Sequence, residues 1–293
     1  FHHLWKIFLN TLPAKQDTTI LTWFEETNKL RANFRKKRLE IASLKKFKGD
    51  PLGLSSNSKW EGFFEESDLK KIIQLDIDRT YQERELFRET AIKDILFDIL
   101  FVWSKAHKAI SYKQGMNEIV AVLLYALYPF YVKNTTKQDT KSYETEIKKI
   151  FQAESENQRV SVPINWKEIY EFFHDEDFLE ADVYQMFSNI MDMGLESFFK
   201  SEPEENTPLM LRCTSLVNNK LKICNSRLYN HFINIKVDIK VILQRYLKCI
   251  FNREFHPKDV LVIWDAVFAY DKKEEDKQLN FIDYVSIAMM EYI

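Results

Sequence analysis

The sequence predicts an all-α protein, and three observations carry this prediction. Only five of the 293 residues are glycine, whereas the tight turns that join β-strands depend on glycine. Apolar residues recur every three or four positions along most of the chain, which is the period of a helix, and no segment alternates convincingly as a strand would. The chain is 45% apolar and 29% charged, which is ordinary for a globular protein with a buried core.

Composition also limits the partners and the compartment. A net charge of −2 gives no general attraction to nucleic acid or anionic lipid, so we expect no nucleic-acid partner. The three cysteines (Cys213, Cys224 and Cys249) are odd in number and lie in apolar or helical surroundings. They predict reduced thiols in a cytoplasmic protein. The most apolar run, residues 119–130, is too short to span a bilayer, so no transmembrane segment is expected. Because Phe1 begins within a helical pattern, we interpret the chain as an excised domain.

The first two helices are predicted from their apolar faces. Residues 4–12 place their apolar side chains on one helical face, and Pro13 ends that helix. A second helix fits residues 17–46. Residues 49–62 contain three of the five glycines together with serine and proline, which predicts a loop.

A short helix over residues 67–74 follows, with Leu69, Ile72 and Ile73 expected in the core. We expect a corner over Asp76–Arg79 after this helix. Thr80 and Glu83 have the spacing of a capping box, which predicts that a new helix begins at Thr80.

The helix that starts after this corner has the clearest period in the chain. Its apolar residues recur with the helical period from Ile92 to Trp103, and this apolar period ends near residues 109–111. Gly115 then permits a close approach of the backbone. Residues 117–128 are apolar on nearly every side, with Glu118 as the only charge, so this helix is predicted to be central.

The rest of the chain continues the helical pattern. Residues 133–165 are polar and lack a sustained period, so we interpret them as a surface insertion with at most a short helix near 143–151. A loop is expected at 201–209. Six further helices are expected at about 179–200, 216–228, 228–235, 238–251, 257–269 and from 281. We predict one domain over 1–293, with a first half of about 1–200 and a second helical half of about 201–293.

The common self-contained catalytic motifs are absent from the sequence. There is no G-x-x-x-x-G-K-[ST] phosphate loop, and no G-x-S-x-G, H-E-x-x-H or kinase motif set. An enzyme that holds its own nucleotide or cofactor is therefore not expected. His174-Asp175 leaves one alternative open, a metal-dependent phosphohydrolase, although the other histidines are scattered along the chain.

Arg79 and Gln114 have side chains that another protein's active site could use. Hydrolysis of GTP needs positive charge on the transferred phosphoryl oxygens and a group that orients the attacking water; an arginine supplied in trans and a glutamine amide meet these needs. Asp76, three residues before Arg79, can bind one edge of the guanidinium and direct the rest. Taken alone, Arg79 among acidic neighbours is also typical of a surface ion pair, and Gln114 of a polar loop residue.

Two short motifs at this spacing carry a family resemblance: Ile73-x-x-Asp76-x-x-Arg79 and Tyr112-x-Gln114-Gly115-Met116. Together they resemble the two signature motifs of the TBC domain, an all-α family of GTPase-activating proteins for Rab GTPases. Further segments are similar in the same order, so the resemblance covers about Trp5 to Ile293. Two positions depart from it: Tyr246 stands where tryptophan is usual, and the arginine that usually precedes Trp5 has no counterpart.

The resemblance implies roles for the residues of both motifs. Arg79 would be the arginine finger, and Gln114 the glutamine finger that replaces the glutamine of the GTPase. Asp76 would orient Arg79, while Tyr112 and Gly115 would shape the glutamine loop. No cofactor of its own is then expected, because GTP and Mg²⁺ are carried by the partner GTPase.

The glutamine motif and the insertion at 133–165 are most similar to the member-5-like branch of this family, which is associated with endosomal Rabs and the retromer coat. The expected partner is a Rab-family GTPase in its GTP-bound state, and a retromer-like coat subunit is a second expected partner. Through such partners, we expect the protein to associate peripherally with endosomal or other vesicle membranes. The alternative function is a catalytically silent TBC-fold adaptor that binds a Rab or a coat subunit.

Overall fold

The computed structural model describes residues 4–14, 18–44, 57–131, 166–200, 207–271 and 279–292. Every regular element in these ranges is helical, so the all-α prediction is confirmed. The first helices are α1 (Trp5–Phe8), α2 (Ile20–Leu44), α3 (Asn57–Asp78), α4 (Thr90–Ala106), α5 (Met116–Leu127), α7 (Trp166–Phe173) and α8 (Leu179–Asp192). The later ones are α9 (Pro208–Ser215), α10 (Lys222–Cys224), α11 (Ser226–Asn234), α12 (Lys240–Lys248), α13 (Pro257–Asp271) and α14 (Phe281–Tyr292).

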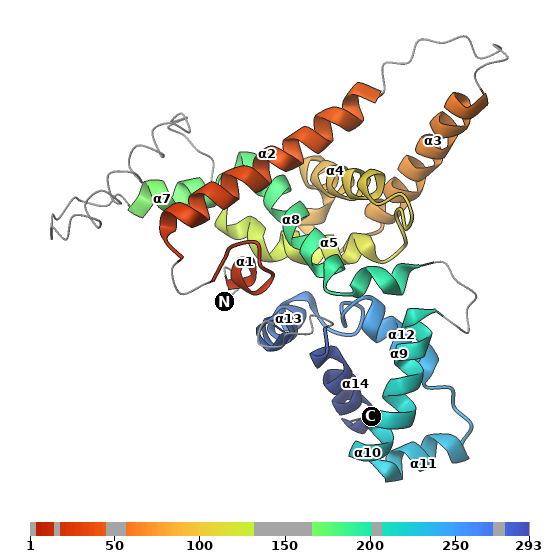
Figure 1. Ribbon diagram of the computed structural model, residues 1–293. Helices are drawn as coiled ribbons and strands as arrows, with labels where there is room; N and C mark the ends of the chain where they lie inside the picture. Colours follow the sequence, from red (N-terminus) through yellow and green to blue (C-terminus); the bar gives the residue numbers. More distant parts are fainter. Residues whose placement is uncertain are drawn as a thin grey trace, which may run out of the picture.

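The helices form two groups that meet at α1 and α13 (Figure 1). Helices α2 to α8 lie together in the upper part of the view, and α9 to α14 lie in the lower part. A single hydrophobic cluster contains buried residues of both groups. The division into halves near residue 200 stays a prediction, and the insertion at 133–165 lies outside the described residues.

Helix α5 lies at the centre of the upper group. Ten of its twelve residues are buried, and it packs against α4, α8, α3 and α13. The expectation of a helix without a solvated face is confirmed. None of the helices in the described ranges is both long enough and apolar enough to cross a membrane.

Charged side chains are buried where α1, α2 and α8 meet. Asp182 of α8 accepts hydrogen bonds from Lys6 Nζ at 2.9 Å, Arg31 Nη2 at 2.8 Å and Tyr131 Oη at 2.5 Å. Burial by itself raises the pKa of Asp182, but the two cations outweigh it and hold this pKa well below the ordinary value. Such a cluster is stable only while every member is paired, so it ties the three helices together in one arrangement.

Several predicted boundaries were wrong. The loop predicted at 49–62 extends too far, because α3 begins at Asn57. This helix continues through Asp78 and so takes up most of the corner expected over 76–79. Within this helix Ile72 is exposed, while Ile73 and Ile77 are buried. Helix α8 ends at Asp192, since Gly194 adopts a left-handed conformation with φ of 92° that favours glycine.

In the second half, α9 begins within the loop expected at 201–209, of which residues 201–206 lie outside the described residues. Thr207 caps α9, accepting a hydrogen bond from the Met210 amide, and Pro208 is the first helical residue. The helix expected at 238–251 ends at Lys248. Ile250 and Phe251 have φ values of 46° and 62°, which a helix cannot contain.

Trp103→Ala should destabilise the fold by about 3–5 kcal/mol, because it empties a fully buried site in the core. Trp103 of α4 is 1% exposed, and its ring meets Phe187 of α8 with 5.5 Å between centroids. Denaturant unfolding measures this loss. Leu39→Ala is the control, since Leu39 is 63% exposed and should change stability by less than about 0.5 kcal/mol. Equal effects of the two substitutions would contradict the predicted core position.

Candidate functional site

A polar hollow of about 440 Å³ lies where the end of α3, the start of α5 and the segment after α12 meet. It brings Arg79 and Gln114 to one place, although 35 positions of sequence separate them. Its other lining residues are Asp76, Thr80, Tyr81, Asn117, Glu118 and Arg253. The two residues chosen from the sequence therefore share one surface with groups from the second half of the chain.

Arg79 directly follows the C-terminal end of α3, and its side chain is 60% exposed. The predicted capping box at Thr80 is wrong. The Thr80 hydroxyl donates to the carbonyl of Asp76 at 2.7 Å, so it closes the end of α3 instead of starting a new helix. The next helix, α4, begins ten residues later at Thr90. Arg79 is thus held by the helix that precedes it.

The Asp76 carboxylate is buried and positions the Arg79 guanidinium. One carboxylate oxygen accepts from Arg79 Nη2, and the other accepts from the Tyr112 hydroxyl at 2.6 Å. Burial and the nearby Asp76 charge raise the pKa of Tyr112 far above its ordinary value, so the hydroxyl remains a donor. Because the carboxylate binds only one edge of the guanidinium, further N–H groups of Arg79 remain for an incoming anion.

Gln114 lies immediately before the N-cap of α5. Gly115 occupies that N-cap with φ of 105°, a left-handed conformation that a residue with a Cβ adopts only under strain. Gln114 is exposed, and its side chain forms no hydrogen bond within the described ranges. The fixed backbone and the unengaged amide leave this side chain able to bind a partner.

Asn117, in the first turn of α5, links the backbone of both loops. Its Oδ1 accepts from the Gly115 amide at 3.1 Å, and its Nδ2 donates to the Thr80 hydroxyl at 2.8 Å. The same Oδ1 lies 3.1 Å from the Tyr112 hydroxyl. One buried amide therefore ties the arginine loop to the glutamine loop, and the sequence reasoning did not find it. An asparagine in an otherwise apolar helix was the available signal.

The opposite wall of the hollow comes from the segment after α12. Arg253 forms a two-pronged ion pair with Glu118 of α5, with its Nε at 2.9 Å and Nη2 at 2.6 Å from Oε1. These hydrogen bonds raise the pKa of Arg253 above its ordinary value. Because Glu118 binds both Nε and Nη2 of Arg253, this guanidinium fixes the wall, whereas Arg79, bound through Nη2 alone, has more N–H groups open to a partner.

Two residues with unusual backbone conformations directly precede Asn252 and Arg253. Ile250 and Phe251 are left-handed, which costs about 1–3 kcal/mol per non-glycine residue. The carbonyl of Ile250 accepts from Trp264 Nε1 at 2.9 Å. Asn252 then donates to the carbonyl of Glu118 at 2.9 Å and accepts from the Tyr81 hydroxyl. No sequence pattern marks these conformations, which is why this wall was not predicted.

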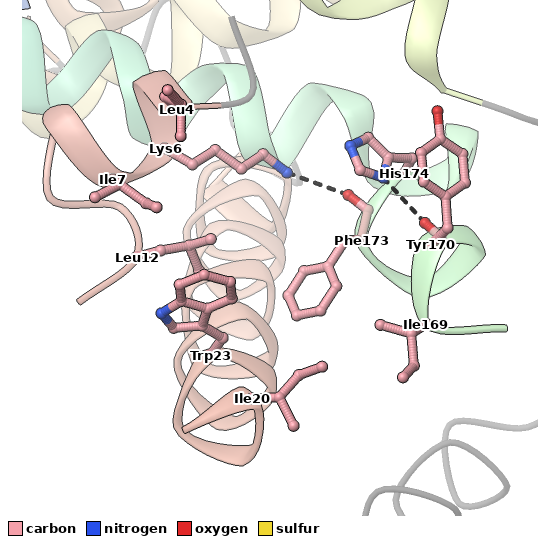
Figure 2. A pocket seen from close by; sticks show the side chains of 10 residues that line it. All are labelled: Leu4, Lys6, Ile7, Leu12, Ile20, Trp23, Ile169, Tyr170, Phe173 and His174. Atoms are coloured by element: carbon pink, nitrogen blue, oxygen red, sulfur yellow. Dashed lines mark hydrogen bonds between the residues drawn. The ribbon is translucent and has the colours of Figure 1, made fainter. Parts of the chain in front are cut away.

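A second hollow of about 550 Å³ lies between α1, α2 and α7 and is mostly apolar. Figure 2 shows two polar side chains of this hollow that bond backbone carbonyl groups. Lys6 Nζ lies 3.1 Å from the carbonyl oxygen of Phe173, and His174 Nδ1 lies 3.0 Å from the carbonyl oxygen of Tyr170. Asp175 accepts from the Asp177 amide. The described part of the chain contains no group of three potential metal ligands, so nothing in it supports the metal alternative at His174-Asp175.

The polar hollow can bind an anionic group and orient a water molecule. Arg79 offers positive charge and Gln114 an amide, and neither is a nucleophile. The only hydroxyl groups on its lining, those of Thr80 and Tyr81, already donate to protein oxygens. The hollow therefore has the parts to complete an active site that another molecule brings.

Comparison with known proteins identifies related sequences. The chain is 26% identical to TBC1 domain family member 5 of Mus musculus and of Homo sapiens, and these alignments cover 99% of the chain. It is 24% identical to the GTPase-activating protein GYP1 of Saccharomyces cerevisiae over 69% of its length. The chain spans only 35% and 36% of the two member 5 proteins and 28% of GYP1.

The fold also matches a solved structure. The crystal structure of the Ypt/Rab-GAP domain of Gyp1p superposes with a TM-score of 0.67 at 18% identity, covering 99% of this chain and 74% of the other. The sequence model of the Rab-GTPase-TBC domain matches residues 3–293. That match extends over both motifs and both groups of helices, and the chain belongs to the Rab-GTPase-TBC domain family.

Proposed function

We propose that this chain accelerates GTP hydrolysis by a Rab-family GTPase, to which it supplies Arg79 and Gln114 in trans. One observation carries the proposal: both side chains lie on one hollow with their polar atoms open to a partner. The family membership and the GTPase-activating relatives support it. Arg79 would neutralise charge on the transferred phosphoryl group, and Gln114 would orient the attacking water.

The surrounding residues would act as positioning residues. Asp76 and Tyr112 hold one edge of Arg79, and Gly115 sets the direction in which Gln114 projects. This arrangement is in place before the GTPase arrives, so little ordering remains to be done on binding. GTP and Mg²⁺ would come with the GTPase, since the sequence has no phosphate loop of its own.

The direct test measures single-turnover hydrolysis by a panel of GTP-loaded Rab GTPases with and without this chain. At least one Rab should show a rate increase of about 10³-fold or more. The second function, a catalytically silent adaptor for a Rab or for a retromer-like coat subunit, predicts binding with no rate change on any member of the panel. Open N–H groups on Arg79 favour the first function, because an adaptor has no use for them.

Asn117→Ala should lower the stimulated rate about 10²-fold, because it releases both loops at once and a shift of about 1 Å in a catalytic group costs that much. The rate at saturating GTPase should fall more than the affinity does. Asn189→Ala on α8 is the matched control, since it removes a partly buried amide that bonds the Leu9 carbonyl at 2.7 Å far from the hollow. If both variants lost activity in proportion to their stability, Asn117 would have only a structural role.

A further inference from the structure

Basic residues are concentrated in two stretches of this chain, residues 29–48 and residues 207–253. Residues 207–253 contain nine Lys or Arg and a single acidic residue, Asp238, while the whole chain has a net charge of −2. The remaining residues are therefore clearly acidic in sum. An overall charge near zero conceals a basic region in the second group of helices, and this region has its own electrostatic field.

Part of this positive charge is neutralised within the protein, and the rest faces solvent. Arg245 pairs with Glu254, Arg253 with Glu118, and Lys220 with Asp283. Three exposed basic residues form no ion pair in the described ranges: Lys222 on α10, Arg227 on α11 and Lys236 between α11 and α12. The nearby carboxylates are Asp238, which lies 3.9 Å from Lys240 Nζ, and Glu291, which accepts from Asn225.

Exposed aliphatic side chains surround Lys236. Between residues 233 and 242 five of them are 38–65% exposed: Ile233, Ile235, Val237, Val241 and Ile242. Ile239 and Leu243 are buried and fix this turn to the core. We call residues 233–242 the basic apolar corner. It joins α11 to α12 in the lower group of helices (Figure 1).

We propose that the basic apolar corner docks this domain on an anionic lipid membrane. Lysine and arginine near a bilayer surface are attracted to anionic headgroups. Exposed aliphatic side chains contribute favourable binding free energy when they enter the boundary between headgroups and acyl chains, because this buries apolar surface. Nucleic acid would use the charge but offers no apolar layer for five aliphatic side chains. Of these two surfaces, only the lipid surface would use both the charge and the apolar side chains of the corner.

The corner also has a fixed position relative to the hollow. Helix α12 begins at Lys240, within the corner, and ends at Lys248, four residues before Asn252. A helix of nine residues is about 13 Å long. Membrane docking at the corner would therefore hold the hollow a short, fixed distance from the bilayer. The proposal does not depend on the proposed function, because it concerns other residues.

Vesicle flotation with the purified chain tests the docking. The chain should bind vesicles of phosphatidylcholine with phosphatidylserine and should not bind phosphatidylcholine alone, and added salt should weaken the binding. Each basic residue near the surface contributes about five-fold in affinity. Lys236→Glu and the double variant Ile235→Asp with Val237→Asp should each weaken binding at least about ten-fold.

Two exposed residues on α2 provide matched controls. Lys36→Glu makes the same change of charge within the basic segment 35–38, and Leu39→Asp, next to that segment, makes one apolar-to-acidic change of the kind made twice in the double variant. They should leave vesicle binding within about two-fold. All variants should retain their helical circular dichroism and any stimulated GTP hydrolysis with a soluble GTPase, since none of these residues lines the hollow.

Three results would overturn the proposal. The first is a parent chain that does not float with phosphatidylserine vesicles. The second is equal loss in the α2 controls and the corner variants, which would indicate unspecific attraction. The third is a parent chain that binds duplex oligonucleotide and does not bind vesicles, with the oligonucleotide binding lost in the corner variants. In each case the GTPase assay would be unaffected, so failure here is distinct from failure of the proposed function.

Discussion

Arg79→Ala should reduce the stimulated rate of GTP hydrolysis by about 10³-fold or more, which is the contribution of an arginine supplied in trans. The side chain is 60% exposed, and within the described ranges it bonds only Asp76, so its loss should leave the fold intact. Asp76 would keep its bond from Tyr112. Single-turnover hydrolysis with a responsive GTPase and unfolding of the same sample measure the two quantities.

Two further variants separate charge from geometry at this position. Arg79→Lys keeps the charge but loses the planar fork, so it should recover only a small part of the activity. Arg35→Ala on α2 removes an exposed arginine away from the hollow and should have no effect. Full stimulation by Arg79→Ala would show that the phosphoryl charge is neutralised by another group, and the assignment of Arg79 would be wrong.

Gln114→Ala should lower the stimulated rate about 10²-fold or more, because the attacking water loses its orienting amide. The alanine variant keeps Gly115 and the bond from its amide to Asn117, so the loop itself should not move. Binding to the GTP-loaded partner should persist. The same rate measurement as for Arg79 records the effect.

Gln185→Ala serves as the matched control for Gln114. Gln185 lies on α8 and donates to Asn189 at 2.7 Å, away from the hollow, and its loss should not change the rate. If Gln114→Ala stimulated as well as the parent chain, the glutamine of the GTPase would be the group that orients the water. The proposed role of this chain would then be reduced to Arg79.

Strong helical periods made much of the fold predictable. The apolar stripe predicted from Ile92 to Trp103 lies on α4, and the apolar run predicted after Gly115 forms the central helix α5. The start of α3 was missed because Gly62 was interpreted as a loop residue, although one glycine costs a helix only about 1 kcal/mol. Because Ile73 and Ile77 pack in the core, that helix continues into the expected corner and ends at Asp78.

The site was predictable only where its residues are close in sequence. Asp76 lies one helical turn before Arg79, and Gly115 directly follows Gln114, so local rules suggested both contacts. Asn252 and Arg253 enter the hollow through long-range contacts and through the left-handed backbone of Ile250 and Phe251. Neither isoleucine nor phenylalanine indicates such a conformation in a sequence, because the surrounding packing imposes it.

The central claim is that both catalytic side chains come from this chain, and one measurement tests it most directly. A responsive Rab whose own water-orienting glutamine is replaced by leucine should be assayed for stimulated GTP hydrolysis. We predict that the parent chain still accelerates this Rab, whereas Gln114→Ala does not, because Gln114 supplies the missing amide. No acceleration of the leucine variant by the parent chain would contradict the claim.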